Sequence, residues 1–231
     1  MKKKIVVLSG AGISAESGIS TFRDSNGLWE NYRIEEVATP DAWDKNPELV
    51  QRFYNQRRKQ VIEAVPNPAH LFFHELESGY DVVIVTQNID DLHERGGSQN
   101  VIHLHGNIRY SKSSGPRQEA KYYPVEGWEL SLNNVCDDGY CLRPHVVWFG
   151  EAVPEMNRAV DVLADADYLI VIGTSLNVYP AAGLIHYVPK SCKRIIVDPK
   201  ALEMNIDKGF TVLAKSAVES IDELKKIFGL A

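Results

Sequence analysis

The stretch "KIVVLSGAGISAESG", residues 4–18, decides the fold. Its apolar run from Ile5 to Leu8 predicts a buried strand, and Gly10, Gly12 and Ala15 then fit the spacing G-x-G-x-x-G/A of a dinucleotide-binding loop. Glycines at these positions let the backbone approach a pyrophosphate, whose charge lies against free amides of a following helix. The same spacing also suits a tight strand-to-helix turn without a ligand, so the motif alone leaves both interpretations open.

Similar apolar runs recur along the chain and alternate with helical patterns. The runs are continuous rather than alternating, which is typical of strands covered on both faces. Expected strands are "DVVIVTQN" (81–88), "NVIHLH" (100–105), "PHVVWFG" (144–150), "YLIVIGTS" (168–175), "KRIIVDP" (193–199) and "FTVL" (210–213); expected helices are "PAHLFFHELES" (68–78), "MNRAVDVLADAD" (156–167) and "AVESIDELKKIFG" (217–229). The pattern predicts an α/β fold with a Rossmann-like, doubly wound and mostly parallel sheet.

Two insertions interrupt this alternation and predict a small accessory lobe. The first, residues 26–65, contains a tight "SNGLW" turn and the helical stretch "PELVQRFYNQRRKQVIEAV" (47–65), with Pro47 at a first-turn position. The second, residues 107–143, has few apolar runs and several glycines and prolines, so we expect loops with little regular structure. The Rossmann-like domain then comprises residues 1–25, 66–106 and 144–231.

Composition excludes some function classes. A net charge of -6, from 25 basic and 31 acidic residues, provides no broad basic surface, so we expect no direct nucleic-acid partner. The apolar run after "MKKK" is too short for an export or membrane segment, and 3 cysteines make a disulfide framework improbable. We therefore expect a cytoplasmic protein with reduced thiols that binds no membrane, and we expect a monomer.

One departure argues against an ordinary dehydrogenase. In such folds a second strand ends in Asp or Glu about 20 residues after the glycine loop, where the acid holds the ribose hydroxyls. Here that region reads "GISTFRDSNGLW" (18–29) and continues into the first insertion. Asp198, at the end of "RIIVD", is the alternative ribose-binding acid.

Polar residues cluster where two expected strands end, which is where ligands bind in open parallel sheets. "VTQNIDDLHE" (85–94) places Gln87, Asn88 and Asp90 at one strand exit, although Asn88 or Asp90 could simply cap a helix. His103 and His105 follow at the next exit, where they could form a metal pair, provide a general base or be structural. The residues alone do not decide between these roles.

Together these segments resemble the sirtuin family of NAD-dependent protein-lysine deacylases. The matching blocks are "GAGISAESGISTFRDSNGLW", "TQNIDDLHERGG", "VIHLHGN", "LRPHVVWFGE", "IGTSLNVYPAAG" and "KSAVESIDEL", in family order over most of the chain. The resemblance implies that His105 is the catalytic base and that Asn88 and Asp90 belong to the catalytic site. It implies an NAD pocket formed by Gly10, Ala11, Gly12, Ile13, Ser14, Phe22, Arg23, Gln87, Asn88, Ile89, Asp90, Gly173, Thr174, Ser175, Asp198 and Ala217.

The resemblance also implies a reaction and a substrate. The acyl oxygen of a modified lysine displaces nicotinamide from NAD, and the products are free lysine and O-acyl-ADP-ribose. An extended acyl-lysine peptide would dock by backbone pairing between two strand edges, formed by Val147, Phe149 and Gly150 and by Asn177, Val178 and Tyr179.

Tyr54 and Arg57 lie three residues apart, hence on one helix face. In sirtuins that remove succinyl, malonyl or glutaryl groups, a Tyr-x-x-Arg pair recognises the acyl carboxylate, and this stretch resembles it. Arg offers a planar fork that matches a carboxylate, and Tyr adds a hydroxyl donor. The alternative is that Tyr54 packs in the core while Arg57 faces solvent. We expect acyl recognition.

The chain departs from the family pattern at the zinc site. Family members carry four cysteines in two pairs, whereas here "NIRYSKSSGPR" (107–117) has serines and only Cys136 and Cys141 remain. Serine hydroxyls are poor zinc ligands, so we expect no structural zinc and a lobe held by packing of Tyr122, Tyr123, Trp128 and Leu130. Asp198 also stands where the family commonly has Asn, and its charge should reject NADP.

Two other functions remain alternatives. One is an NAD glycohydrolase or mono-ADP-ribosyltransferase that uses the same site without acyl-lysine. The other is a catalytically reduced sensor of NAD or ADP-ribose.

Overall fold

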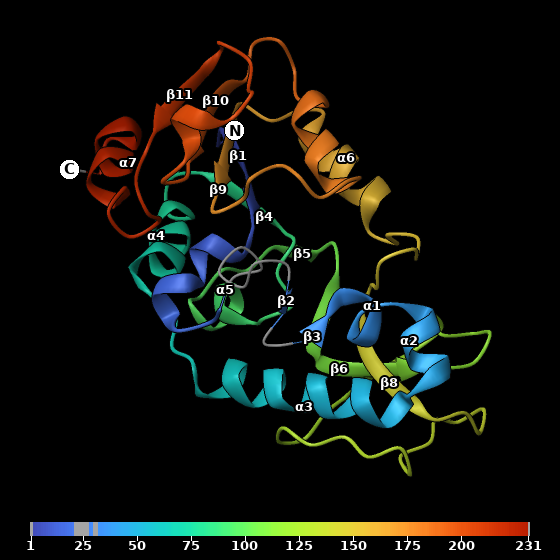
Figure 1. Cartoon of the computed structure of the whole chain (residues 1–231). Coiled ribbons are helices and arrows are strands. Elements are labelled where there is room, and N and C mark those ends of the chain that lie inside the picture. Colours follow the sequence, from blue (N-terminus) through green and yellow to red (C-terminus); the bar gives the residue numbers. More distant parts are fainter. Residues whose placement is uncertain (1, 21–27, 30–31, 231) are drawn as a thin grey trace.

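A six-stranded parallel sheet forms the larger part of the molecule (Figure 1). The structure, a computed structural model, describes residues 2–20, 28–29 and 32–230. The strand order is β11-β10-β9-β1-β4-β5. The strands are β1 (Lys4–Ser9), β4 (Asp81–Thr86), β5 (Val101–His103), β9 (Tyr168–Ile172), β10 (Lys193–Val197) and β11 (Phe210–Leu213). The chain winds from β1 to one side through β4 and β5 and later to the other side through β9, β10 and β11, which confirms the doubly wound α/β fold.

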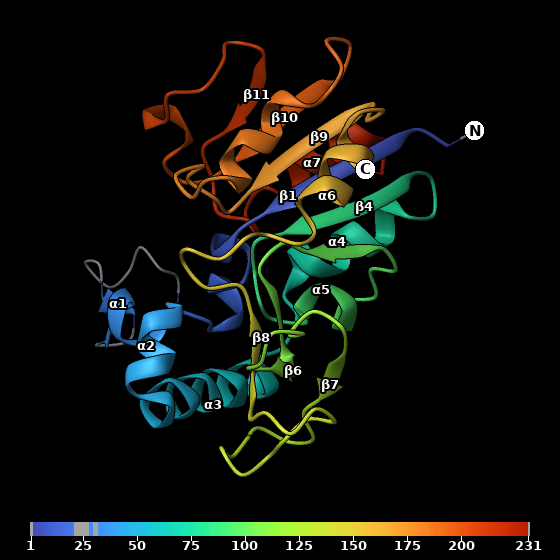
Figure 2. The same ribbon diagram turned by 90° about the vertical axis from the view of Figure 1, so that its right-hand side faces the viewer.

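Helices cover both faces of this sheet, as its continuous apolar runs predicted (Figures 1 and 2). The strand expected at 144–150 is not part of it, because β8 (Leu142–Val146) belongs to a separate antiparallel sheet. On one face Ile5 and Val7 of β1 pack in a cluster with residues of α4 (Pro68–Leu76) and α7 (Ile221–Phe228). On the other face Val6 and Leu8 pack with α6 (Met156–Leu163) and the 3-10 helix η3 (Ala181–His186). Successive strand residues point to opposite faces, so a strand buried on both faces has no polar alternation.

The central strand also shows how the sheet is aligned. Ile5 lies opposite Val82 of β4 on one side and opposite Tyr168 of β9 on the other. This register brings the carboxyl ends of β1, β4 and β9 to the same edge of the sheet. The first 3-10 helices, η1 (Ala11–Ile13) and η2 (Ala15–Ser17), begin at that edge. The α-helix expected after the glycine loop is therefore replaced by two short 3-10 turns, the second ending at Gly18 with φ 84°.

The small lobe combines helices from the first insertion with a three-stranded antiparallel sheet, order β7-β6-β8. Its elements are β2 (Leu28–Trp29), β3 (Tyr32–Arg33), α1 (Ile34–Val37), α2 (Pro40–Lys45), α3 (Pro47–Glu63), β6 (Gly106–Ser113), β7 (Tyr122–Pro124) and β8 (Leu142–Val146). The expected helix at 47–65 is confirmed: Pro47 begins it, and the Asn46 side chain accepts a hydrogen bond of 3.0 Å from the Leu49 amide. The remaining elements are α5 (Leu92–Arg95) and η4 (Ala201–Glu203).

The expectation of little regular structure in residues 107–143 fits residues 114–121 and 125–141, which lie outside the named helices and strands, but it missed strand β6. β6 runs for 8 residues and pairs with both β7 and β8. Its sequence, "GNIRYSKS", is mostly polar, so it carries no strand signal. The strand forms because its backbone groups pair with β8, a segment that lies about 30 residues further along the chain.

Helix α3 attaches this loop-rich segment through polar side chains. Gln51 and Asn55 both donate to the carbonyl oxygen of Leu130, at 2.8 and 3.0 Å. Arg58, which is fully buried, donates to the carbonyls of Ile108 (2.6 Å) and Trp128 (2.9 Å) and to the side chain of Asn55 (2.8 Å). We name Gln51, Asn55 and Arg58 the polar stripe of α3.

Aromatic packing contributes less to the lobe than the sequence suggested. Leu130 and Tyr123 do pack in a small cluster with Cys136 and Leu142, but the side chains of Tyr122 and Trp128 are about 40% exposed. The polar stripe holds Trp128 and Leu130 by their main-chain carbonyls instead. Among the described helices none is both long and apolar enough to span a bilayer.

Candidate functional site

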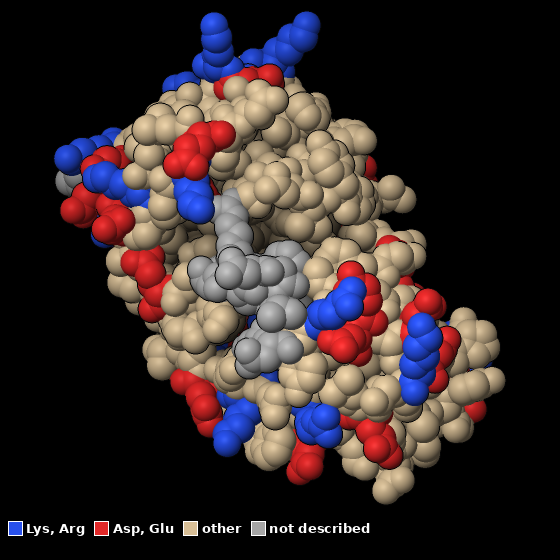
Figure 3. Space-filling model, viewed as in Figure 1, with Lys and Arg blue, Asp and Glu red and all other residues tan. Residues whose placement is uncertain are grey.

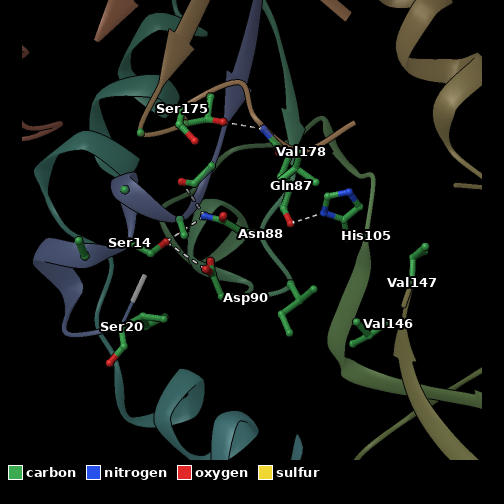
Figure 4. Close-up of a pocket in the computed structure, with 18 of the residues that line it drawn as sticks. Ser14, Ser20, Gln87, Asn88, Asp90, His105, Val146, Val147, Ser175 and Val178 are labelled. Carbon is green, nitrogen blue, oxygen red and sulfur yellow. Dashed lines mark hydrogen bonds between the residues drawn. The ribbon is translucent and has the colours of Figure 1, made fainter. Parts of the chain in front are cut away.

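A pocket of about 550 Å³ opens at the carboxyl edge of the parallel sheet and extends to the small lobe (Figure 4). The loops after β1, β4, β9 and β10 line one part of it. Residues of α3 and of the segment after β8 line the other part. Its size lies in the range of small-molecule and cofactor sites.

Glycines allow the loops after β1 and β9 to touch at this edge. The Gly12 amide donates to the Gly173 carbonyl at 2.8 Å. A Cβ on Gly12 would lie 2.6 Å from the Gly173 Cα, and a Cβ on Gly10 would lie 2.7 Å from the Thr174 Cβ. Gly173 itself has φ 63°. The glycines of the opening motif therefore have a packing reason, and the amides of Gly10 and Gly12 both donate to carbonyls within the protein.

Asn88, Ser14 and Asp90 form a hydrogen-bonded cluster on the pocket wall (Figure 4). The Asn88 side-chain amide donates to Ser14 Oγ and to the Gly10 carbonyl, each at 3.2 Å. Ser14 Oγ donates to Asp90 Oδ2 at 3.0 Å, and the Leu92 amide donates to Asp90 Oδ1 at 3.1 Å. Burial raises the pKa of Asp90, and these two hydrogen bonds offset part of that effect. The Asp90 carboxyl therefore accepts from the amide at the start of α5, as a helix-capping residue would. The same carboxyl also accepts from Ser14 in the loop after β1.

His105 lies in the turn after β5 and faces the pocket (Figure 4). Its Nδ1 is 2.9 Å from the carbonyl oxygen of Gln87, and a carbonyl can only accept, so Nδ1 carries the proton. In the neutral ring the lone pair is then on Nε2. Burial lowers the pKa of His105, and the hydrogen bond to Gln87 opposes that effect. The neutral base form of this imidazole is favoured.

His103 has a different environment and is not in this pocket. Its Nδ1 contacts the Asn88 carbonyl at 3.1 Å and its Nε2 contacts Glu94 at 2.6 Å. Both ring nitrogens are used in holding the segment after β4, which favours the structural interpretation of His103. In the described part of the chain no group of three or more His, Cys, Asp and Glu side chains is arranged to hold a metal ion.

Tyr54 and Arg57 both line the pocket from helix α3, and neither faces solvent. Tyr54 is fully buried and Arg57 is 5% exposed. The indole Nε1 of Trp148 donates to the Tyr54 hydroxyl at 3.1 Å. Burial raises the pKa of Tyr54, so the hydroxyl keeps its proton. The alternative that Arg57 is a solvated surface side chain is therefore wrong.

Most residues expected at the site lie around this one pocket. These are Gly10, Ala11, Gly12, Ser14, Tyr54, Arg57, Gln87, Asn88, Ile89, Asp90, His105, Val147, Phe149, Gly150, Gly173, Thr174, Ser175, Val178, Tyr179, Asp198 and Ala217. Ile13 instead packs in the core beside α4, and Asn177 is exposed and does not line the pocket. Phe22 and Arg23 lie outside the described residues.

The segments expected as peptide-docking strand edges are not strands in this structure. β8 ends at Val146, before residues 147–150, and residues 177–179 lie between β9 and η3. The amide of Val147 donates to the His105 carbonyl at 2.9 Å, and that of Phe149 to the Ala38 carbonyl at 3.0 Å. Tyr179 is 75% exposed at the pocket.

Sequence reasoning missed several lining residues, among them Ile19, Ala38, Val61, Trp148, Lys200 and Ser216. For Ser216 the signal was its position beside Ala217. Glu16 accepts from the Ser216 hydroxyl at 3.1 Å and from the Val218 amide at 3.0 Å, which ties the β1 loop to this segment. For Trp148 the signal was its position between Val147 and Phe149, but its contact with Tyr54 had none, since Tyr54 is 94 residues away.

The sheet order, the glycine loop and the pocket across the strand ends define a dinucleotide-binding type of α/β protein with an added small lobe. Comparison with known proteins is more specific. Residues 10–180 match the model of the Sir2 family. The chain therefore belongs to the Sir2 family.

Relatives and solved structures agree with this. The NAD-dependent protein deacylase of Bacteroides thetaiotaomicron is 48% identical over 228 residues, 97% of each protein. That of Helicobacter pylori strain 26695 is 48% identical over 224 residues, 96% of each. A Sir2 homologue in complex with NAD has a TM-score of 0.87 at 40% identity, covering 99% of this chain and 90% of that one. A mutant Sir2 homologue in complex with ADP-ribose has a TM-score of 0.89 at 41% identity, covering 99% and 93%.

Proposed function

We propose that this chain is an NAD-dependent protein-lysine deacylase. The observation that carries the proposal is His105, which presents a neutral Nε2 to a pocket at the strand ends of a Sir2-family fold. The pocket's residues fit NAD, because Gly10, Gly12 and Gly173 line it without side chains and Asp198 provides an acid that can accept from ribose hydroxyls. The substrates are acyl-lysine proteins, on which the chain acts as a monomer without binding nucleic acid or membranes.

The roles of the chain's own groups follow from their positions. NAD supplies the sugar carbon that accepts the acyl oxygen, with nicotinamide as leaving group. His105 removes a proton from a ribose hydroxyl, for which its lone pair must be on Nε2. Asn88 and Asp90, held by Ser14, shape the wall next to the base and receive nicotinamide. Gln87 positions His105 through its carbonyl and contacts Thr174 through its side chain at 3.1 Å.

The assay that tests this proposal is nicotinamide release by purified protein with and without an acyl-lysine peptide. We expect release that depends strictly on the peptide. Release without peptide would mean a glycohydrolase, and transfer of ADP-ribose to protein would mean an ADP-ribosyltransferase. No release under either condition would mean a sensor.

We further propose that the enzyme accepts succinyl-type acyl groups in addition to acetyl. Tyr54 and Arg57 are both buried beside the pocket on α3, where a guanidinium and a hydroxyl donor can meet a carboxylate that is shielded from water. Arg57→Met should reduce desuccinylation far more than deacetylation. Arg52→Met is the matched control, since Arg52 is an exposed arginine on the same helix. Equal loss of both activities in Arg57→Met would contradict the assignment.

We also propose that the small lobe folds without structural zinc. The polar stripe of α3 already holds the carbonyls of Leu130, Ile108 and Trp128. Of the two remaining zinc-type cysteines, Cys136 has its sulfur within hydrogen-bond distance of both the Asp138 carboxylate and the Tyr140 carbonyl, so its single S–H can donate to either one. Elemental analysis of purified protein by mass spectrometry should find far less than one zinc per chain; one bound zinc per chain would overturn the proposal.

A further inference from the structure

Trp148 connects the pocket to a buried ion pair. Its side chain is 2% exposed, and its indole Nε1 lies 3.1 Å from the Tyr54 hydroxyl oxygen. An indole N–H is only a donor, so Tyr54 must be the acceptor in this hydrogen bond. The hydrogen of the Tyr54 hydroxyl is then directed away from Trp148.

The indole is held in place from several sides. The Arg143 guanidinium carbon lies 3.3 Å from the centre of the Trp148 ring, and the Trp43 ring lies 5.8 Å away at 35°. Arg143 forms two hydrogen bonds to Glu151, at 2.7 and 3.0 Å. Glu151 also accepts from the Trp148 amide at 2.8 Å, so the same ion pair fixes both the ring and the main chain of Trp148.

We propose that Trp148 is a positioning residue for acidic acyl groups, because its N–H occupies one acceptor position of the Tyr54 hydroxyl and so orients the O–H for donation to the acyl carboxylate. This inference rests on the proposed deacylase function and on carboxylate recognition by Tyr54 and Arg57. A phenol can donate or accept, and a carboxylate can only accept, so a fixed hydroxyl orientation favours a carboxylate over a group that offers a donor. A hydrogen bond to a charged acceptor is also stronger than one between neutral groups.

An acetyl group has no carboxylate and does not use this donor. The effect of Trp148 on substrate binding should therefore be larger for succinyl-type substrates than for acetyl substrates. A residue that only supported the fold would change both substrates equally.

The experiment compares Trp148→Phe, Tyr54→Phe and the double variant with the parent on acetyl-lysine and succinyl-lysine peptides of the same sequence. Trp148→Phe keeps an aromatic ring next to Arg143 but lacks the N–H. We expect the ratio of its succinyl KM to its acetyl KM to rise about fivefold to tenfold, the scale of one hydrogen bond between neutral groups. The double variant should be no worse than Tyr54→Phe alone, because the indole acts only through the tyrosine hydroxyl.

Several results would overturn the inference. Additive losses in the double variant, or equal losses on both peptides, would show that Trp148 acts through general packing. Unchanged succinyl KM in Trp148→Phe would show that the hydroxyl needs no orientation. Failure of the proposed function would give a different result, because the parent protein would then turn over neither peptide. Thermal melting of each variant identifies any loss of activity that is due to unfolding.

Discussion

The imidazole Nδ1 of His105 lies 2.9 Å from the carbonyl oxygen of Gln87, and the two residues follow β5 and β4, which are consecutive in the chain and paired in the sheet. This contact fixes both the tautomer and the direction of the ring, so that one nitrogen is anchored and the other serves as base. Gly106, with φ 81°, lets the chain turn directly after the histidine, and a side chain there would collide with the His145 carbonyl.

Replacing this base should separate catalysis from binding. His105→Ala is expected to lower kcat for an acyl-lysine peptide by about 10²–10⁴-fold, the usual contribution of a general base. NAD binding, measured by calorimetry, should change little, since Gln87, Asn88 and the glycine loop remain. His186→Ala is the control, because His186 is exposed and does not line the pocket. Undiminished peptide turnover in His105→Ala would refute the role of His105.

The pH profile of the enzyme should reflect burial of the same ring. Burial lowers the pKa of His105 below its ordinary value of about 6.5, and only the neutral form is a base. Activity should therefore be complete above that ordinary value and fall as the pH drops through the lowered pKa. The acidic limb of kcat/KM, which reports the free enzyme, should have its midpoint below about 6.5 and should disappear in His105→Ala. A midpoint above that value would contradict a buried neutral base.

Much of the large sheet could be predicted because its physics is local. β1 and β9 are short apolar runs buried on both faces, and their glycine-rich exits mark the edge where ligands bind. The acid and amide cluster at Asn88 and Asp90 could be located for the same reason. Their hydrogen bonds to Ser14 could not, because they join loops that are more than 70 residues apart.

The small lobe was less predictable because its stability depends on distant pairs of polar groups. β6 is polar in sequence and exists through pairing with β8. From the sequence, Arg58 would be expected to be a solvated surface charge next to Arg57. In the structure it is fully buried and donates to main-chain carbonyls. Likewise, nothing near Trp148 in the sequence indicates that its indole contacts Tyr54.

Two buried histidines should make folding stability depend on pH. Burial lowers the pKa of His70 to about 4 and that of His93 well below its ordinary value. The unfolded chain then binds protons near pH 6.5 that the native state does not, so stability is full above that pH and is lost as the pH falls. For His70 the loss continues until the pH reaches about 4. Protonation of His70 alone should cost roughly 2 kcal/mol of unfolding free energy between pH 7 and 5, and His93 acts in the same direction.

Urea unfolding at a series of pH values measures this dependence. His70→Gln should reduce the slope of the unfolding free energy against pH by the amount that corresponds to about one bound proton. This holds whatever the effect of the substitution on stability at pH 7. His186→Gln, which changes an exposed histidine, should leave the slope unchanged. A parent protein equally stable at pH 7 and 5 would show that these rings are charged or accessible in the native state.

The polar stripe of α3 predicts how the lobe fails when one anchor is removed. Arg58→Met keeps the length of the side chain but leaves the carbonyls of Ile108 and Trp128 without their donor, and buried groups in that state cost about 1–3 kcal/mol each. We expect Arg58→Met to lower the unfolding free energy by about 3 kcal/mol and to increase hydrogen exchange in β6 and residues 128–130 before it does so in β1 or β9. Arg52→Met is the matched control, since Arg52 is an exposed arginine on the same helix. Because the stripe acts through hydrogen bonds, a zinc chelator should change the stability of neither the parent nor the variant. Faster exchange spread evenly over both sheets would show instead that Arg58 supports the fold as a whole and that the lobe has no anchor of its own.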